Sequence, residues 1–281
     1  METTQKAKII TVTYQKGGLG KSAVSVNLSA ILAWKGYKVL LIDGDRHCTT
    51  SHYLGVHDDT KVGFFDVVVG SCTLDQAIRR IDYIPSGENA FKYDPFCLYA
   101  IPAYDNIGVD ENELRSFPDW QNLLKKALSE SRAFSEFDYI IIDCPPESDI
   151  FLPIIYNAAD FFILPMFPER QPLNNLGITY DKIFSLTKHS TPKKIMGCVV
   201  LNYEKNRSAA TVISDLRGLS FINCFQTVIP HYKDYDDTLK AQMPMIVFYK
   251  EYGLGRPFCF SFISFAEEII NYFEQEGNTN E

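Results

Sequence analysis

A glycine-rich turn near the start of the chain constrains the fold more than any other feature. The segment QKGGLGKS (residues 15–22) follows an apolar, β-branched run at residues 8–13. A helical pattern of apolar residues comes next, over residues 23–35, and Gly36 ends it. A strand, a tight turn and a helix in this order begin a βαβ unit, which places the strand in a parallel sheet.

Further apolar runs, separated by helical patterns, extend this prediction along the chain. Short helical pieces are expected over 48–82, a surface loop over 83–95, and helix over 111–134 with a break near Pro118. The fold class is therefore α/β, a doubly wound, mainly parallel sheet with helices on both faces. Besides 8–13, buried strands are expected at residues 37–42, 96–101, 138–143, 161–164, 195–201 and 225–229.

Composition and length favour one soluble domain over residues 1–281. No linker, charge block or repeat divides the chain, and about seven residues before the first strand leave no room for a helix-turn-helix domain. The seven cysteines form no CxxC pair, which is typical of reduced thiols in cores rather than of a zinc site. The polar N-terminus is not a signal peptide, and no run of 18 apolar residues occurs, so we expect a cytoplasmic protein.

The turn itself has the composition of a phosphate-binding loop. Gly17, Gly18 and Gly20 would let backbone N–H groups approach phosphate oxygens, and the following helix directs its positive dipole end at the same place. Lys21 could reach β- and γ-phosphates, and the Ser22 hydroxyl could ligate Mg²⁺. Gln15 stands where the usual G-x-x-x-x-G-K-[ST] loop begins with glycine, and Lys16 instead opens the pattern K-G-G-x-G-K-S.

Three aspartates follow predicted strands. Asp43 and Asp45 come after the strand at 37–42, and Asp143 ends the strand at 138–143. The carboxyl ends of parallel strands meet at one edge of a sheet, where ligands bind. Carboxylates there can hold Mg²⁺ through its waters or orient a nucleophilic water.

These segments carry a family resemblance. The sequence resembles the ParA/MinD family of P-loop ATPases, whose "deviant" Walker A loop reads KGGxGK[ST]. FDYIIIDCPP (137–146) resembles the Walker B strand, and the match runs nearly end to end in the family's order. The other matching segments are residues 14–51, 62–78, 96–107, 158–177, 193–207 and 228–249.

The resemblance implies the role of each matching residue. Lys16, Lys21 and Asp45 are the catalytic set; Lys16 would cross into the partner's site of an ATP-sandwiched homodimer, and Asp45 would position the attacking water. ATP and Mg²⁺ are the implied cofactors, with Ser22, Asp43 and Asp143 at the metal. The implied nucleotide-binding residues are Gly17, Gly18, Leu19, Gly20, Lys21, Ser22, Ala23, Asn202 and Pro230. Three departures stand out: Tyr14 for a common Asn, Ala23 for a common Thr, and Arg46-His47 for Pro-Gln.

Among the family's outputs, we expect an ATP-dependent dimer switch that partitions plasmid or chromosome DNA, or another cargo. DNA-partitioning members bind DNA without sequence preference and are reset by a ParB-like partner that stimulates hydrolysis. The net charge of −8 argues against a nucleic-acid coat, but residues 190–259 carry 9 Lys and Arg against 6 Asp and Glu. A DNA contact could use Lys205, Arg207 and Lys233, and association with the nucleoid would follow.

Two alternatives come from the same resemblance. A MinD-like positioning or regulatory ATPase would act on a protein or membrane partner. Residues 262–273 form an apolar helical stripe, but Glu267, Glu268, Glu274 and Glu276 give its polar side the wrong sign for an anionic membrane, so we expect it to pack on the core. A nucleotide sensor with little turnover is the second alternative, suggested by Arg46 and His47.

Overall fold

One sheet organises the part of the chain that the structure, a computed structural model, describes: residues 7–57, 62–85, 93–104, 111–148, 150–187 and 193–279. Its eight strands are arranged in the order β3-β4-β2-β5-β1-β6-β7-β8, and all neighbouring pairs are parallel except β3 with β4. The strands are β1 (Lys8–Val12), β2 (Val39–Asp43), β3 (Arg79–Tyr83), β4 (Phe96–Ile101), β5 (Tyr139–Asp143), β6 (Phe161–Met166), β7 (Lys194–Tyr203) and β8 (Cys224–Pro230).

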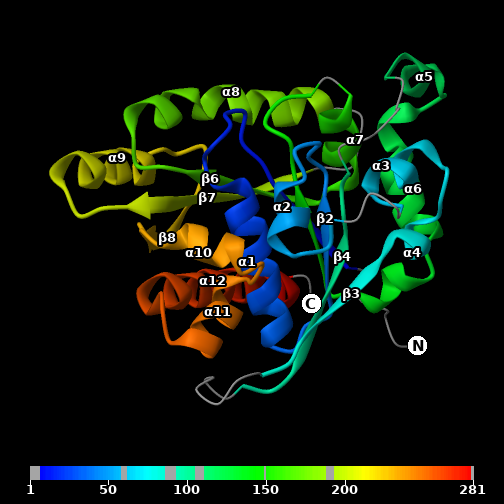
Figure 1. The fold of residues 1–281 in the computed structure, drawn as a ribbon. Helices are drawn as coiled ribbons and strands as arrows, with labels where there is room; N and C mark the ends of the chain where they lie inside the picture. Colours follow the sequence, from blue (N-terminus) through cyan, green and yellow to red (C-terminus); the bar gives the residue numbers. More distant parts are fainter. Residues whose placement is uncertain are drawn as a thin grey trace.

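Helices cover both faces of this sheet, which confirms the predicted doubly wound architecture. In Figure 1, α8 and α9 lie on one side of β6, β7 and β8, and α11 and α12 lie on the other. The helices are α1 (Lys21–Trp34), α2 (Thr49–Tyr53), α3 (Phe64–Val69), α4 (Leu74–Ala77), α5 (Glu111–Ser116), α6 (Leu123–Glu130), α7 (Phe151–Ala158), α8 (Arg170–Thr187), α9 (Arg207–Arg217), α10 (Tyr235–Lys240), α11 (Met245–Tyr252) and α12 (Arg256–Thr279), with 3₁₀ turns η1 (Trp120–Asn122) and η2 (Ala133–Glu136).

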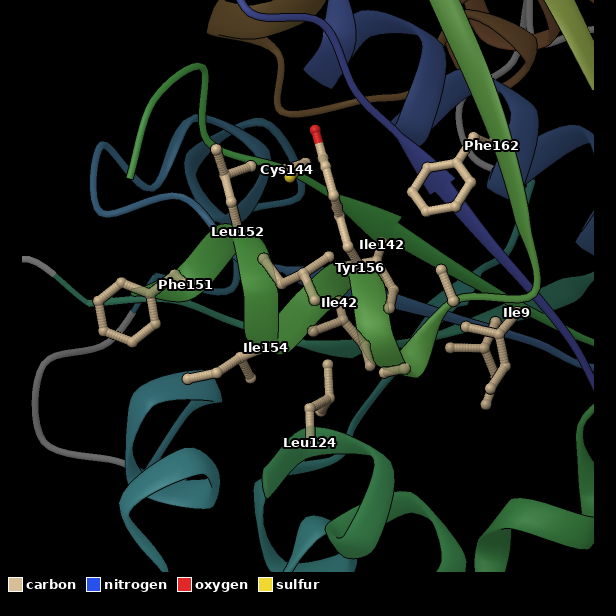
Figure 2. Close-up of a cluster of buried hydrophobic side chains, with 14 of the residues drawn as sticks. Ile9, Ile42, Leu124, Ile142, Cys144, Phe151, Leu152, Ile154, Tyr156 and Phe162 are labelled. Carbon is tan, nitrogen blue, oxygen red and sulfur yellow. The ribbon is translucent and has the colours of Figure 1, made fainter. Parts of the chain in front are cut away.

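Two hydrophobic cores follow from the alternation of side chains along the strands. In β5, Ile140 and Ile142 enter the core that α7 covers, whereas Tyr139 and Ile141 enter the core beneath α1 and α12. Figure 2 shows the first core, where side chains of α7 pack against those of β2 and β5. A strand buried on both faces reads as a continuous apolar run, which is why the sequence predicted it so clearly.

The strand β3 corrects one prediction. Residues 48–82 were expected to be helical pieces and 83–95 a surface loop, but Arg79–Tyr83 forms an antiparallel edge strand on β4. Arg80 and Asp82 are exposed and Arg79 is half-buried, so the run lacks the apolar continuity by which the buried strands were found. Residues 86–92 of the expected loop lie outside the described residues. The predicted break within 111–134 is confirmed, because α5 ends at Ser116 and η1 begins at Trp120.

The C-terminal helix packs on the sheet, as predicted. Phe262, Phe265 and Ile269 of α12 are fully buried in the second core. On its polar side, the Glu268 carboxylate accepts the backbone N–H groups of Gln226 and Thr227 in the edge strand β8, at 2.8 and 2.7 Å. Among the described residues, no helix is both long enough and apolar enough for a membrane crossing. All seven cysteines are free thiols, and five of them are buried, which confirms their expected place in the cores.

Candidate functional site: a phosphate loop and a cavity at the carboxyl edge

The loop between β1 and α1 has the backbone that close approach to an anion requires. Gly18 and Gly20 adopt left-handed conformations, with φ of 75° and 79°. A Cβ atom on Gly20 would lie 3.3 Å from Leu201 Cδ2, so this position is constrained by space as well as by φ. The helix α1 begins at Lys21, directly after Gly20, and its first N–H groups have no partner within the helix. The loop and the helix N-terminus together form a concave group of donors.

A cavity of about 710 Å³ opens beside this loop at the carboxyl edge of the sheet. In the sheet, β1 lies between β5 and β6. Strands β2 to β5 lie on one side of β1 and strands β6 to β8 lie on the other, so the strand order reverses at β1, and ligands of such sheets bind at this point. Most of the residues predicted for a nucleotide site line this one cavity. They are Gly17, Gly18, Gly20, Lys21, Ser22, Ala23, Asp45, Asn202 and Pro230, joined by Lys233.

The remaining predicted residues lie outside the cavity lining. Leu19 is buried, so only its backbone is available to a ligand. Lys16 donates to Gln171 of α8, and Asp43 and Asp143 are buried, each 1% exposed. Lys205 and Arg207 are exposed around the start of α9, so the structure does not bring them together with Lys233 at the cavity.

Asp43 and Asp143 are register partners at the ends of β2 and β5. The Asp43 carboxylate accepts the Ser51 backbone N–H and hydroxyl at 2.8 and 2.7 Å, and the Asp45 N–H at 3.1 Å. Burial, and then the charge of Asp143, raises the pKa of Asp43 to about 7 in spite of these donors. Asp43 therefore connects β2 to the start of α2 and places a second buried carboxylate beside Asp143.

Asp143 faces the phosphate loop. Its carboxylate accepts hydrogen bonds from Ser25 at 3.1 Å and from Thr50 at 2.7 Å. Burial raises the pKa of Asp143, while the neighbouring Ser22 hydroxyl, the hydrogen bond from Thr50 and the charge of Lys21 lower it. Ser22 and Asp143 are thus neighbouring oxygen donors next to a lysine.

The side chains of Arg46 and His47, which the sequence analysis treated as one departure, lie in different places after β2. The Asp45 carboxylate accepts the His47 N–H at 3.0 Å, and both residues line the cavity. The Arg46 guanidinium instead lies over the Phe151 ring, 5.0 Å from its centroid, and 5.8 Å from that of Phe65. His47 is therefore the departure that changes the cavity wall, and Arg46 is a surface residue that covers an aromatic pair.

The first residues of the loop are attached to α8. The Lys16 Nζ donates to Gln171 Oε1 at 2.7 Å, and the buried Tyr14 hydroxyl donates to the carbonyl oxygen of Pro172. Desolvation holds the pKa of Tyr14 far above its ordinary value, so the phenol stays a donor. The Tyr14 departure from the common Asn thus connects the phosphate loop to the start of α8.

The far end of the cavity is lined by the ends of β7 and β8. Asn202 has a left-handed backbone, φ 55°, and its Oδ1 lies 2.6 Å from His231 Nδ1. Phe167, Leu201 and Tyr232 add apolar surface on this side. Phe167 and Leu201 were not among the predicted site residues, whereas His231 and Tyr232 directly follow the predicted Pro230.

The match to a protein family agrees with this geometry. The model of the AAA domain family matches residues 7–195, which is more than half of the chain and includes β1 to the start of β7. The chain belongs to this family. Residues 7–195 contain the loop, its lysines and all three aspartates of the carboxyl edge.

Two curated relatives match most of the length of the chain. The sporulation initiation inhibitor protein Soj of Bacillus subtilis is 29% identical over 244 residues, covering 86% of this chain and 91% of Soj. The chromosome partitioning protein ParA of Caulobacter vibrioides is 26% identical over 267 residues, covering 94% of each chain. These matches confirm the resemblance to the ParA/MinD family of P-loop ATPases.

Solved structures with the same fold cover nearly the whole chain. A Cyanothece McdA variant in complex with ATP has a TM-score of 0.76 at 20% identity, covering 95% of this chain and 97% of that one. The cobyrinic acid a,c-diamide synthase of Mycobacterium smegmatis, with an ATP analog and magnesium, has a TM-score of 0.74 at 21% identity, covering 95% and 96%. At these identities the likeness establishes the fold alone.

Proposed function

We propose that this protein is a Mg²⁺-dependent ATPase switch of the ParA type, which dimerises around ATP and partitions DNA or another cargo. The proposal rests on one observation: Lys21, Ser22 and Asp45 line the same cavity as the glycines of the loop. ParA of Caulobacter vibrioides, which resembles this chain over most of its length, is named as a chromosome partitioning protein. The bound ATP and ATP analog in structures of the same fold support the choice of ligand.

Binding of a triphosphate would depend on the loop and on Lys21. This lysine is 7% exposed and stands at the first position of α1, so its ammonium is preorganised beside the helix N-terminus. Backbone N–H groups at Gly17, Gly18 and Gly20 supply further donors. The cavity extends from there to Asn202 and Pro230, far enough to take a base as well as phosphates.

The residues around Ser22 fit Mg²⁺. Their oxygens are the hard ligands that this cation prefers, and the Asp143 carboxylate lies close to both Ser22 and Lys21. Burial raises the pKa of both Asp43 and Asp143, so their ionised forms are disfavoured, and a cation bound nearby would stabilise them. The cation would supply charge neutralisation at the phosphates when bound, and Ser22, Asp43 and Asp143 are the residues that would hold it.

Hydrolysis would depend on Asp45. It lines the cavity beside the loop, and the His47 N–H holds one of its oxygens at 3.0 Å. The other carboxylate oxygen is available to orient a water for attack on a terminal phosphate. His47 lines the same wall, so the rate depends on this departure as well. A nucleotide sensor would bind ATP equally well but release almost no phosphate. Single-turnover hydrolysis with protein in excess over ATP distinguishes a sensor from the switch.

Dimerisation tests the proposal most directly. With a slowly hydrolysed ATP analog and Mg²⁺, we expect the wild type to double its mass in light scattering. Lys21→Ala should bind no nucleotide and stay at the apo mass. Lys16→Ala should bind nucleotide but not dimerise. Lys125→Ala, an exposed lysine on α6, is the matched control and should behave as wild type. A Lys16→Ala protein that dimerises normally would refute the role of Lys16 in the partner's site.

DNA is proposed as the surface on which the switch acts. Lys205 and Arg207 are exposed at α9, and two copies in a dimer would double their phosphate contacts. Binding to random duplex DNA should need ATP and fall steeply between 50 and about 200 mM salt. If the protein with ATP does not shift the electrophoretic mobility of duplex DNA at low salt, DNA is removed from the proposal. A ParB-like partner would then be found by its stimulation of phosphate release.

A membrane-acting, MinD-like role has less support. The apolar side chains of α12 that a lipid surface would need are buried against the sheet, including Phe262 and Phe265. Flotation with anionic liposomes, with and without residues 260–281, tests this alternative.

A further inference from the structure

Hydroxyl groups hold both oxygens of the Asp143 carboxylate. Ser25 of α1 donates to Oδ1 at 3.1 Å, and Thr50 of α2 donates to Oδ2 at 2.7 Å. The Ser25 hydroxyl also donates to the Lys21 carbonyl oxygen at 3.0 Å, so its single proton is shared between two acceptors. Thr50 therefore makes the shorter of the two bonds to Asp143, and rotation of the carboxylate would break it.

The chain between β2 and α2 wraps around the end of β5. The Gly44 N–H donates to the Asp143 carbonyl oxygen at 2.9 Å. A Cβ atom on Gly44 would lie 2.7 Å from Ile155 Cδ1 and 2.9 Å from that carbonyl oxygen, so this close approach requires glycine. Asp143 is thus bound through its backbone to the start of the segment 44–50, and through its side chain to Thr50 at the end.

Other contacts of α2 hold Thr50 in this place. The next residue, Ser51, donates from its hydroxyl to the Asp43 carboxylate at 2.7 Å. The Tyr53 hydroxyl lies 3.0 Å from Thr238 Oγ1 of α10, and both of these residues are buried. A side chain whose own position is fixed by its surroundings can hold a neighbouring group in one orientation. Thr50 is therefore a preorganised donor, and it is itself 1% exposed.

The position of Asp143 gives the Thr50 bond a consequence for a bound cation. The Asp143 carboxylate lies close to Ser22 and Lys21 at the phosphate loop. Groups that hydrogen-bond to a metal-binding side chain orient it, and their loss typically weakens metal affinity by about 10- to 100-fold. A carboxylate oxygen has two acceptor sites, so the Thr50 bond leaves Oδ2 able to accept a second partner. Thr50 can thus orient the carboxylate without competing for it.

We propose that Thr50 is a positioning residue for Mg²⁺, which acts through Asp143 and strengthens binding of the cation together with the nucleotide. The inference rests on the proposed function, because it requires that the cavity bind a nucleotide with Mg²⁺. Thr50 is buried and does not belong to the cavity lining, so it touches neither the phosphates nor the base. It adds a residue to Ser22 and the aspartates that the sequence pattern marked.

Calorimetric titration with a slowly hydrolysed ATP analog, in EDTA and in saturating Mg²⁺, tests this role. The ratio of the two dissociation constants measures how strongly the site couples the cation to the nucleotide. Thr50→Val keeps the shape of the side chain but loses the hydroxyl, so the ratio should fall about tenfold while the affinity in EDTA stays unchanged. Thr50→Ser keeps the hydroxyl and should retain the wild-type ratio. Thr211→Val, at an exposed position of α9, is the matched control.

The titration in EDTA separates this inference from the proposed function. A wild type that binds the analog in neither condition, or equally in both, refutes the Mg²⁺-dependent switch itself. A Thr50→Val protein that binds in EDTA as the wild type does and keeps the full ratio overturns the inference alone. A Thr50→Ser protein with a ratio as low as that of Thr50→Val overturns it as well, because the hydroxyl would not be the deciding group.

A second variant covers the case in which Thr50→Val does not fold, as judged by circular dichroism. Thr50→Cys has a side chain of similar size and a much weaker donor. It should lower the ratio by a smaller amount, again with unchanged affinity in EDTA. A Thr50→Cys protein with the full wild-type ratio would then overturn the inference.

Discussion

The Lys16 ammonium donates a 2.7 Å hydrogen bond to the side-chain oxygen of Gln171, at the start of α8 in the same chain. The lysine that the proposed dimer needs in a partner's site is therefore attached to its own subunit. It must leave Gln171 before it can reach across. Tyr14, two residues earlier, donates to the neighbouring Pro172 carbonyl and does not need to move.

Removal of the Gln171 side chain should make the ATP dimer tighter. A hydrogen bond of this kind contributes about 0.5–1.5 kcal/mol, so Gln171→Ala should lower the dimer dissociation constant by about two- to tenfold. Analytical ultracentrifugation with a slowly hydrolysed ATP analog measures the change. Asn174→Ala, at an exposed position of the same helix, is the control. A weaker dimer in Gln171→Ala would mean that Gln171 acts in the dimer rather than against it.

Asp45→Asn should separate hydrolysis from binding. Asparagine keeps an oxygen for the His47 N–H but loses the charge that orients and activates a water, so phosphate release should fall by about 10²- to 10⁴-fold. Nucleotide affinity should change little, and the ATP dimer should persist for longer. Single-turnover phosphate release measures the first effect and light scattering the second. Asp181→Asn, exposed on α8, should match the wild type in both.

Tyr14→Phe should destabilise the fold through one hydrogen bond. The ring stays in its buried place, but the Pro172 carbonyl loses its donor. The expected cost in free energy of unfolding is about 1–3 kcal/mol, which urea denaturation can measure. Tyr252→Phe, which alters a hydroxyl on a 55% exposed ring, should cost almost nothing. An equal effect of the two substitutions would contradict the importance of the Tyr14 contact.

Phe265→Ala should test how far α12 is integral to the fold. The ring is fully buried and meets Phe225 of β8 edge-on, with centroids 5.0 Å apart. Truncation should lower the free energy of unfolding by about 3–5 kcal/mol. Phe260→Ala, one turn earlier and 45% exposed, provides a matched comparison and should cost about 1 kcal/mol or less. Similar losses for both would show that α12 is only loosely packed.

The buried strands and the phosphate loop were predictable because each has a local cause. Ile140, Ile141 and Ile142 form an apolar run since both faces of β5 are covered. Gly18 and Gly20 are needed for positive φ and for close approach, and the pattern shows both. By contrast, β3 escaped prediction because Arg79 and Arg80 belong to an edge strand, which is defined by its neighbour β4 and not by its own composition.

Contacts between distant segments could not be predicted from single positions. The sequence marked Tyr14 and His47 as departures but did not show that one binds the start of α8 and the other lines the cavity. The Lys16–Gln171 and Asn202–His231 pairs depend on residues 155 and 29 positions apart. Each requires the arrangement of strand ends that only the folded sheet provides.

The Glu268 carboxylate has a consequence for assembly. Edge strands with free N–H groups readily recruit a strand from another molecule. On β8, the N–H groups of Gln226 and Thr227 are already satisfied by α12, so a neighbouring copy could extend the sheet there only by displacing that side chain. These contacts protect the edge against uncontrolled polymerisation through β8. Reversible association is then free to depend on the nucleotide.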